Sequence, residues 1–340
     1  MKIVSALKKL LSAPKHIVIT MHTRPDADAL GASLGLATFL KQKQHTVSII
    51  APTAYPNFLA WLPGITEVIV YSEGHHALCT ERIKKADIIF CIDFTLLHRI
   101  NELSEVVKNA TATKVVIDHH LDKEDFADLV LRRPGAAATA ELIYQLIKDL
   151  DAHIQLNKDI ATCLYVGIIT DTASFKNANT TPHVHRVAAN LIELGADVAR
   201  TNRLVYENNS LDRLQFISFA ISQRLVVLPA YHTAYFAIQA SDAKRFNLTT
   251  GDTEGLVNHA LSIRGIVLAA LISEKEDVIR LSLRSIGNFP VNVFAKEHFA
   301  GGGHKHASGG TSHLSLQETT AKFEALVNAH QRSLAAAYEA

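Results

Sequence analysis

His22-Thr23-Arg24-Pro25-Asp26-Ala27-Asp28-Ala29-Leu30-Gly31-Ala32-Ser33 is the stretch that decides the fold of this chain. It follows residues 17–21, an apolar, β-branched run with the length of a strand, and it leads into apolar residues at helical spacing. The polar residues therefore lie on a turn from a strand to a helix. Pro25 disfavours helix at the residue before it, and either Asp26 or Asp28 can cap the helix that follows.

One histidine and two aspartates within this short turn suit a divalent cation that prefers imidazole and carboxylate ligands, such as manganese. Turns at the carboxyl ends of strands are also where open α/β sheets bind ligands. The alternative is an acidic helix start next to an ordinary histidine, which would hold if no further ligands occurred elsewhere in the chain. The remaining sequence decides between the two.

Two further apolar runs end in groups that bind metals. Residues 87–92 and residues 114–117 both have the composition of buried strands. The side chains at their carboxyl ends are Asp93, Asp118, His119 and His120. Because the carboxyl ends of parallel strands meet at one edge of a sheet, we expect these groups to converge with those of the opening turn.

Helical patterns alternate with the strands, at residues 95–109 and 137–150. This alternation predicts an α/β fold with a parallel sheet covered on both faces. A further helix over about residues 157–170 delivers Asp171 at its C-terminal end. A carboxylate is electrostatically disfavoured at that end of a helix, and a nearby cation would reverse the effect.

The character of the chain changes after a stretch of polar, helix-prone sequence. We predict a first domain with the candidate metal ligands over residues 1–187, a helical linker over 188–223, and a smaller α/β domain with a mixed sheet over 224–340. Strand-like runs occur at residues 234–239, 265–273 and 278–283 of this last part.

A glycine-rich segment at residues 301–310 is the most distinctive piece of the second domain. Its glycines let a ligand approach backbone N–H groups closely, and a helix beginning near His304 would add its positive end. The segment therefore predicts an anion-binding loop; a tight structural turn without a ligand is the alternative. The preceding Arg284 is either a surface charge or a bidentate phosphate ligand, and the loop favours the second interpretation.

The composition is that of an ordinary soluble globular protein. Apolar residues make up 48% of the 340 residues and charged residues 20%, which gives no indication of disorder. The net charge of +1 argues against a broad phosphate footprint for long duplex nucleic acid, although a small anionic substrate stays open. The three cysteines predict neither a zinc ribbon nor a disulfide framework. Residues 1–14 lack a signal-peptide core and no apolar run could span a bilayer, so we expect a cytoplasmic protein without membrane contact.

Together the motifs closely resemble those of the DHH phosphoesterase family, specifically the nanoRNase branch that also hydrolyses 3′-phosphoadenosine 5′-phosphate. The matching residues are His22-x-x-Pro25-Asp26-x-Asp28-x-x-Gly31, Asp93, Asp118-His119-His120, Asp171-Thr172, and Gly301-Gly302-Gly303-His304-x-x-Ala307-Ser308-Gly309-Gly310 preceded by Leu283-Arg284-Ser285. The resemblance covers nearly the whole chain. It departs from the family at Ala32, which separates Gly31 from Ser33. It also departs at Ala173-Ser174, where many relatives have a glycine after the Asp-Thr pair.

The resemblance implies two divalent cations, manganese or alternatively magnesium. The first would be held by His22, Asp26 and Asp93, and the second by Asp28, Asp93, His119 and Asp171. Asp93 would then bridge the two ions. It also implies that His120 lies beside the reacting phosphate and that Asp118 orients an imidazole. The residues it implies for substrate binding are Arg284, Gly302, Gly303, His304 and Ser308.

The function implied is that of a two-metal phosphoesterase, an enzyme that degrades very short oligoribonucleotides to 5′-mononucleotides and also acts on 3′-phosphoadenosine 5′-phosphate. Hydrolysis of cyclic or linear dinucleotides is the nearest alternative, and an inorganic pyrophosphatase or polyphosphatase is a more distant one. A nucleotide-binding regulator without activity is the non-enzymatic alternative, although it would not need every metal ligand. A homodimer is left open.

Overall fold

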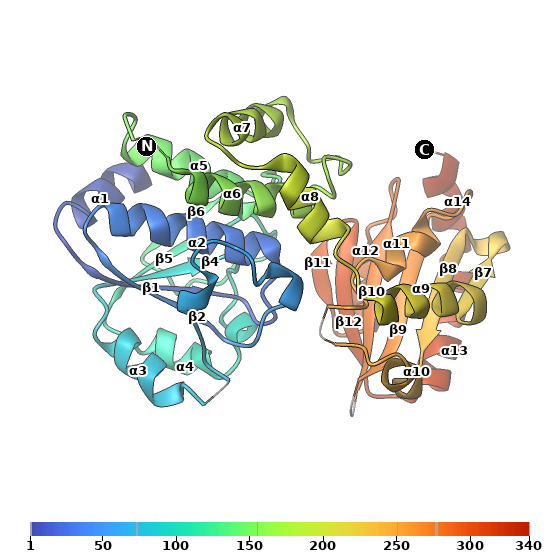
Figure 1. Cartoon of the computed structure of the whole chain (residues 1–340). Coiled ribbons are helices and arrows are strands. Elements are labelled where there is room, and N and C mark those ends of the chain that lie inside the picture. The colour runs from blue at the N-terminus through green and yellow to red at the C-terminus, as the bar shows by residue number, and fades with distance from the viewer. Residues whose placement is uncertain (1, 73, 155, 250, 276–277, 340) are drawn as a thin grey trace. The chain divides into compact units, whose positions relative to one another are not determined.

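The computed structural model describes residues 2–72, 74–154, 156–249, 251–275 and 278–339. The chain forms two compact units, Met1–Asn208 and Asn209–Ala340, each with its own sheet and core (Figure 1). Helices α7 (Pro182–Glu193), α8 (Val198–Tyr206) and α9 (Leu211–Gln223) occupy the region of the predicted linker. The domain limits at residues 187 and 223 stay predictions.

The first unit is built on a parallel sheet, as the sequence predicts. Its strands are β1 (His16–Met21), β2 (Thr46–Ala51), β3 (Val68–Val70), β4 (Ile88–Ile92), β5 (Thr113–Asp118) and β6 (Leu129–Arg132), in the order β3-β2-β1-β4-β5-β6. Every pair of neighbouring strands runs parallel. The sheet's strand order reverses beside β1, which places β1, β4 and β5 side by side at its centre.

Helices cover both faces of this sheet (Figure 1). They are α1 (Lys2–Leu10), α2 (Ala27–Gln42), α3 (His76–Lys84), α4 (Leu103–Lys108), α5 (Thr139–Leu150) and α6 (Lys158–Asp171), with short 3₁₀ turns η1 (Asn57–Leu59), η2 (Ile65–Glu67) and η3 (Leu97–Ile100). Ile17 and Ile19 of β1 face a core shared with α2, α5 and α6, whereas Val18 faces a core shared with α3 and α4. The single helix predicted over residues 95–109 is instead two shorter elements, η3 and α4.

Two glycines bring α2 and α6 into close contact. A Cβ atom at Gly31 of α2 would lie 2.3 Å from the carbonyl oxygen of Cys163 on α6. A Cβ atom at Gly167 of α6 would lie 2.8 Å from Oδ1 of Asp28. Larger residues would therefore push the helices apart. The first turn of α2 is held against α6, whose last residue is Asp171.

The second unit is a mixed sheet with helices, which confirms the predicted class. The strands are β7 (Leu225–Leu228), β8 (Thr233–Ile238), β9 (Leu268–Lys275), β10 (Val278–Ser285), β11 (Gly302–His304) and β12 (Ala307–Ser312), in the order β11-β12-β10-β9-β8-β7. The β8–β9 pair is parallel and the other pairs are antiparallel. The helical elements are α10 (Ala240–Arg245), α11 (Leu256–Leu261), α12 (Val291–His298), α13 (Leu316–Ala329), α14 (Gln331–Glu339) and the 3₁₀ turn η4 (Pro229–Tyr231).

The prediction of a helix beginning near His304 is wrong. The glycine-rich segment forms the hairpin β11–β12, in which Gly303 pairs with Ser308, and β12 completes the sheet beside β10. A Cβ atom at Gly301 would lie 2.1 Å from the carbonyl oxygen of Gly309. Glycine is a poor helix former, and here it allows two backbone segments to approach closely instead.

The three cysteines, Cys79, Cys91 and Cys163, are buried free thiols. Within the described residues, none of the helices combines the length and the apolar character that crossing a membrane requires.

Candidate metal centre

The carboxyl ends of β1, β4 and β5 bring the candidate ligands of the first unit together. His22 follows β1, Asp93 follows β4, and His119 follows β5. Asp26 is the N-cap residue of α2, where its side chain accepts hydrogen bonds from the backbone N–H groups of residues 28 and 29. The parallel sheet thus gathers side chains that lie far apart in the sequence.

The first set of ligating atoms comes from His22, Asp26 and Asp93, which lie within 4.8 Å of one another. His22 Nε2 is 3.3 Å from Asp93 Oδ2 and 3.8 Å from Asp26 Oδ2. One imidazole and two carboxylates are a donor set that suits manganese or magnesium.

A second set consists of Asp28, His119 and Asp171, again within 4.8 Å of one another. His119 Nε2 is 3.2 Å from Asp171 Oδ2 and 3.9 Å from Asp28 Oδ2. It also lies 3.6 Å from Asp93 Oδ1. Asp93 therefore turns one oxygen toward each set, which is the arrangement that a carboxylate bridging two cations requires.

Both imidazoles are oriented by the backbone. His22 Nδ1 lies 2.8 Å from the carbonyl oxygen of Thr23, and His119 Nδ1 lies 3.1 Å from that of Ala136. A carbonyl can only accept, so each Nδ1 carries the proton and donates it. In the neutral ring Nε2, which faces the carboxylates, is then the nitrogen with the lone pair that a metal needs, whereas a second proton on Nε2 of His22 donates to Asp93.

Asp118 and His120 form a pair beside these two sets. His120 Nδ1 is 2.7 Å from Asp118 Oδ1, and the backbone N–H of His120 donates to Asp118 Oδ2 at 3.1 Å. Asp118 is fully buried, whereas about a fifth of the His120 side chain is exposed. His120 Nδ1 also lies 3.7 Å from Asp93 Oδ1. The buried carboxylate fixes the orientation of an imidazole at the margin of the centre.

The electrostatics of the centre favour a bound cation. Burial raises the pKa of Asp28 well above its usual range, and the charges of Asp93 and Asp171 add to this effect. Burial likewise raises the pKa of Asp171 to about 7. Burial opposes ionisation of Asp93 too, but its hydrogen bond with His22 and the charges of His120 and His119 hold its pKa well below the usual value. Divalent cations would relieve the crowding of these carboxylates, so the residues fit such ions.

The N-terminus of α5 supports the centre in a way that the sequence analysis missed. Ala138, the N-cap residue of α5, has no side chain able to cap the helix. The carboxylate of Asp28 takes this role, accepting hydrogen bonds from the backbone N–H groups of Thr139 at 2.6 Å and Ala140 at 2.8 Å. The hydroxyl of Thr139 donates to Asp93 Oδ1 at 2.6 Å. The first turn of α5 thereby holds two candidate ligands, Asp28 and Asp93.

We expect Thr139→Val to weaken metal binding about 10–100-fold, because it removes the donor that orients Asp93 while keeping the shape of the side chain. Thr139→Ser keeps the hydroxyl and should bind metal as the original protein does. Calorimetric titration of the metal-free variants with Mn²⁺ measures both. Equal affinity of the valine and serine variants would show that the hydroxyl does not position Asp93.

The predicted substrate-binding residues of the second unit lie on β10 and on the hairpin β11–β12. Arg284, half-buried on β10, pairs in register with Ala307 of β12. Gly302 is exposed with open space beside it, whereas Gly303 has a φ of +139° and is closely packed. Ser308 is buried, and its hydroxyl donates to the carbonyl oxygen of His304 at 3.0 Å. Ser308 thus braces the turn that carries His304.

Comparison with known proteins identifies the chain. The family model described as "DHH family, N-terminal domain" matches residues 16–168, and the DHHA1 domain matches residues 231–334. A protein of Thermus thermophilus named as a bifunctional oligoribonuclease and PAP phosphatase is 31% identical over 318 residues, which cover 92% of this chain and 88% of that protein. This chain belongs to the DHH family. Its parallel sheet is the DHH domain, and its mixed sheet is the DHHA1 domain.

Two further proteins extend this DHH comparison. The crystal structure of an exopolyphosphatase-related protein from Bacteroides fragilis superposes with a TM-score of 0.93 at 34% identity, covering 98% of this chain and 97% of that one. A cyclic-di-AMP phosphodiesterase of Geobacillus thermodenitrificans is 26% identical over 312 residues, which cover 88% of this chain but 45% of that longer protein.

Proposed function

We propose that this chain is a two-metal phosphoesterase that degrades very short oligoribonucleotides to 5′-mononucleotides and also dephosphorylates 3′-phosphoadenosine 5′-phosphate. The observation that carries the proposal is Asp93, whose two carboxylate oxygens face two separate sets of ligating atoms. The name of the Thermus thermophilus relative, which matches along almost its whole length, supports the choice of substrates.

We propose that His22, Asp26 and Asp93 hold one cation and that Asp28, Asp93, His119 and Asp171 hold the other. When bound, two divalent ions supply the positive charge that stabilises the negative charge developing on a phosphoryl group. The residues themselves fix the positions of these charges before substrate arrives, because buried carbonyls and N–H groups anchor the ligands from behind.

His120 is proposed to act on the reacting phosphate. The buried Asp118 orients its ring through Nδ1. An imidazole held in this way can donate a hydrogen bond or a proton to a phosphoryl or leaving-group oxygen.

The finer properties follow as proposals. We assign manganese as the preferred ion, with magnesium as the alternative, because the donor sets combine imidazole and carboxylate. The substrate is short RNA or a nucleotide phosphate rather than long duplex nucleic acid, and the protein is cytoplasmic. A homodimer is compatible with this function, and we do not require one.

A second candidate is hydrolysis of cyclic or linear dinucleotides. The cyclic-di-AMP phosphodiesterase relative favours it, although this chain spans less than half of that protein. Inorganic pyrophosphate or polyphosphate is a more distant candidate, and a nucleotide-binding regulator would be the non-enzymatic one.

A substrate panel separates these candidates. Initial rates should be measured with a diribonucleotide, a pentaribonucleotide, 3′-phosphoadenosine 5′-phosphate, cyclic-di-AMP and pyrophosphate, each with Mn²⁺, with Mg²⁺ and with EDTA. The proposal expects the highest kcat/KM on the diribonucleotide and on 3′-phosphoadenosine 5′-phosphate, and no turnover in EDTA. Preference for cyclic-di-AMP would favour the second candidate, and lack of turnover on all five would favour the regulator.

Arg284 is proposed to hold a phosphate of the substrate other than the one that reacts. Arg284→Ala should therefore leave metal content unchanged and lower kcat/KM on the diribonucleotide about 10–150-fold, the loss expected for a charge-assisted bidentate contact. The loss should be smaller on a small chromogenic phosphodiester, which lacks a second group to hold. Arg280→Ala, an exposed arginine on the same strand, is the matched control. Equal losses on both substrates would contradict this role.

A further inference from the structure

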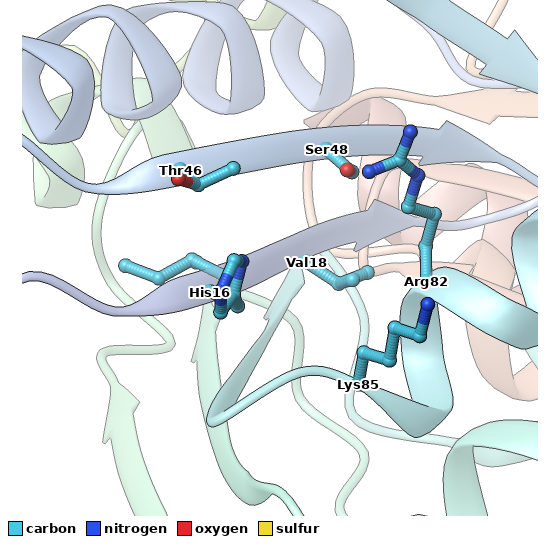
Figure 2. Close-up of a pocket in the computed structure, with 7 residues that line it drawn as sticks. His16, Val18, Thr46, Ser48, Arg82 and Lys85 are labelled. Atoms are coloured by element: carbon cyan, nitrogen blue, oxygen red, sulfur yellow. The ribbon is translucent and has the colours of Figure 1, made fainter.

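A pocket lies in the DHH domain, at the opposite ends of the strands from the metal centre. Its volume is about 410 Å³, and it is lined by His16, Ile17, Val18, Thr46, Ser48, Arg82 and Lys85 (Figure 2). His16 begins β1, whereas His22 follows the end of that strand. Five residue steps of about 3.3 Å each separate the two ends of β1, which places the pocket roughly 16 Å along the strand from the metal centre.

The strands under this pocket depart from the usual pattern of a parallel sheet. Such strands are normally apolar on both faces, because helices cover both. Side chains alternate between faces, so Thr46 and Ser48 share a face with Ile50, and His16 shares it with Val18. The register places His16 beside Thr46 and Val18 beside Ser48. A polar patch therefore lies on a sheet face that α3 and α4 cover elsewhere.

The side chains above the patch are cationic. Arg82 lies in the last turn of α3 and Lys85 is its C-cap residue. In Figure 2 the guanidinium end of Arg82 lies beside Ser48, and the ammonium end of Lys85 points to the same side of the sheet. Two permanent positive charges, an imidazole and two hydroxyl groups thus surround one space.

Nearby acidic side chains already have partners. Glu81 pairs with Lys85 at 2.5 Å, and the carboxylate of Asp87 accepts a hydrogen bond from the backbone N–H of His16 at 2.8 Å. Within the described part of the chain, Arg82 takes part in no ion pair. Its guanidinium therefore keeps donors for an external ligand, and hydroxyl groups that can donate lie within the same pocket.

From this arrangement we infer that the pocket binds a phosphate group, and that its volume admits the nucleoside of a mononucleotide, with the apolar side chain of Val18 on the same sheet face. Guanidinium donors match phosphate oxygens bidentately, and hydroxyl groups complete such sites. The volume is in the range of small-molecule sites and exceeds what a phosphate alone fills. The inference does not rest on the proposed function, because it uses no residue of the metal centre or of the DHHA1 domain.

Calorimetry on the metal-free chain of 340 residues tests the inference. The background variant is Arg284→Ala, which removes the phosphate ligand proposed in the DHHA1 domain, and EDTA removes any metal. Adenosine 5′-monophosphate, inorganic phosphate and adenosine are titrated separately. We expect adenosine 5′-monophosphate to bind most tightly, phosphate to bind more weakly, and adenosine to show no binding that depends on Arg82.

In this background Arg82→Ala should weaken binding of adenosine 5′-monophosphate about tenfold, the effect of losing one charge-assisted contact of roughly 1.4 kcal/mol. Lys84→Ala removes an exposed charge from the same helix without lining the pocket and should change the affinity less than about twofold. Equal effects of the two variants, or no binding of either phosphate ligand in the background variant, would overturn the inference.

Discussion

Asp93→Asn will remove bound metal and turnover together, lowering kcat by at least about 10³-fold while the chain stays folded. The reason is that Asp93 turns one carboxylate oxygen toward each set of ligating atoms. Asparagine is the right replacement because Asp93 has a φ of +64°, a conformation that asparagine tolerates better than alanine. Metal content by mass spectrometry and kcat should be measured on the same preparation.

Asp125→Asn is the matched control, since it neutralises an exposed aspartate outside the candidate ligand sets. It should keep both metal and turnover. Near-normal turnover of Asp93→Asn with metal still bound would refute the bridging assignment. A loss of the thermal unfolding transition would instead point to a purely structural role, so the melting temperature belongs in the same experiment.

His120→Ala should behave differently, because it removes a group proposed to act on the phosphate rather than to hold metal. We expect metal content to stay unchanged and kcat to fall about 10²–10⁴-fold, the range for loss of a general acid or base. Asp118→Asn should lower kcat in the same direction, since it disturbs the carboxylate that orients the ring.

His153→Ala, which removes an exposed histidine outside these sets, serves as the control for His120→Ala. Metal content and single-turnover rates with a diribonucleotide distinguish the outcomes. Loss of metal from His120→Ala would make this imidazole a ligand, and an unchanged single-turnover rate would exclude it from the chemical step.

The sequence predicted the architecture well because its signals are local or follow from the geometry of parallel sheets. Apolar runs mark the central strands, and the ends of parallel strands must meet, so Asp93 and His119 could be expected near His22. The cap of α2 by Asp26 is equally local. The prediction of a helix near His304 failed because glycines also permit close pairing of strands. The sequence alone did not show that this segment pairs with β10 as strand β12.

The support from α5 could not have been predicted in this way. Ala138 and Thr139 carry no motif that points to Asp28, which lies 111 residues before Thr139. The pocket above β1 and β2 was missed for a related reason. Thr46 and Ser48 look like ordinary strand residues, and only the register of the sheet and the position of α3 bring Arg82 to them.

Asp28 links two segments that lie more than a hundred residues apart in the sequence. Its hydrogen bonds join the first turn of α2 to the first turn of α5. The amide protons of Thr139 and Ala140 are consequently built-in reporters of this carboxylate. A change that loosens Asp28 weakens the two hydrogen bonds that protect these amide protons from exchange with solvent. The rate of hydrogen–deuterium exchange at these two amides therefore reports how firmly Asp28 is held. The measurement needs neither a substrate nor an attached probe.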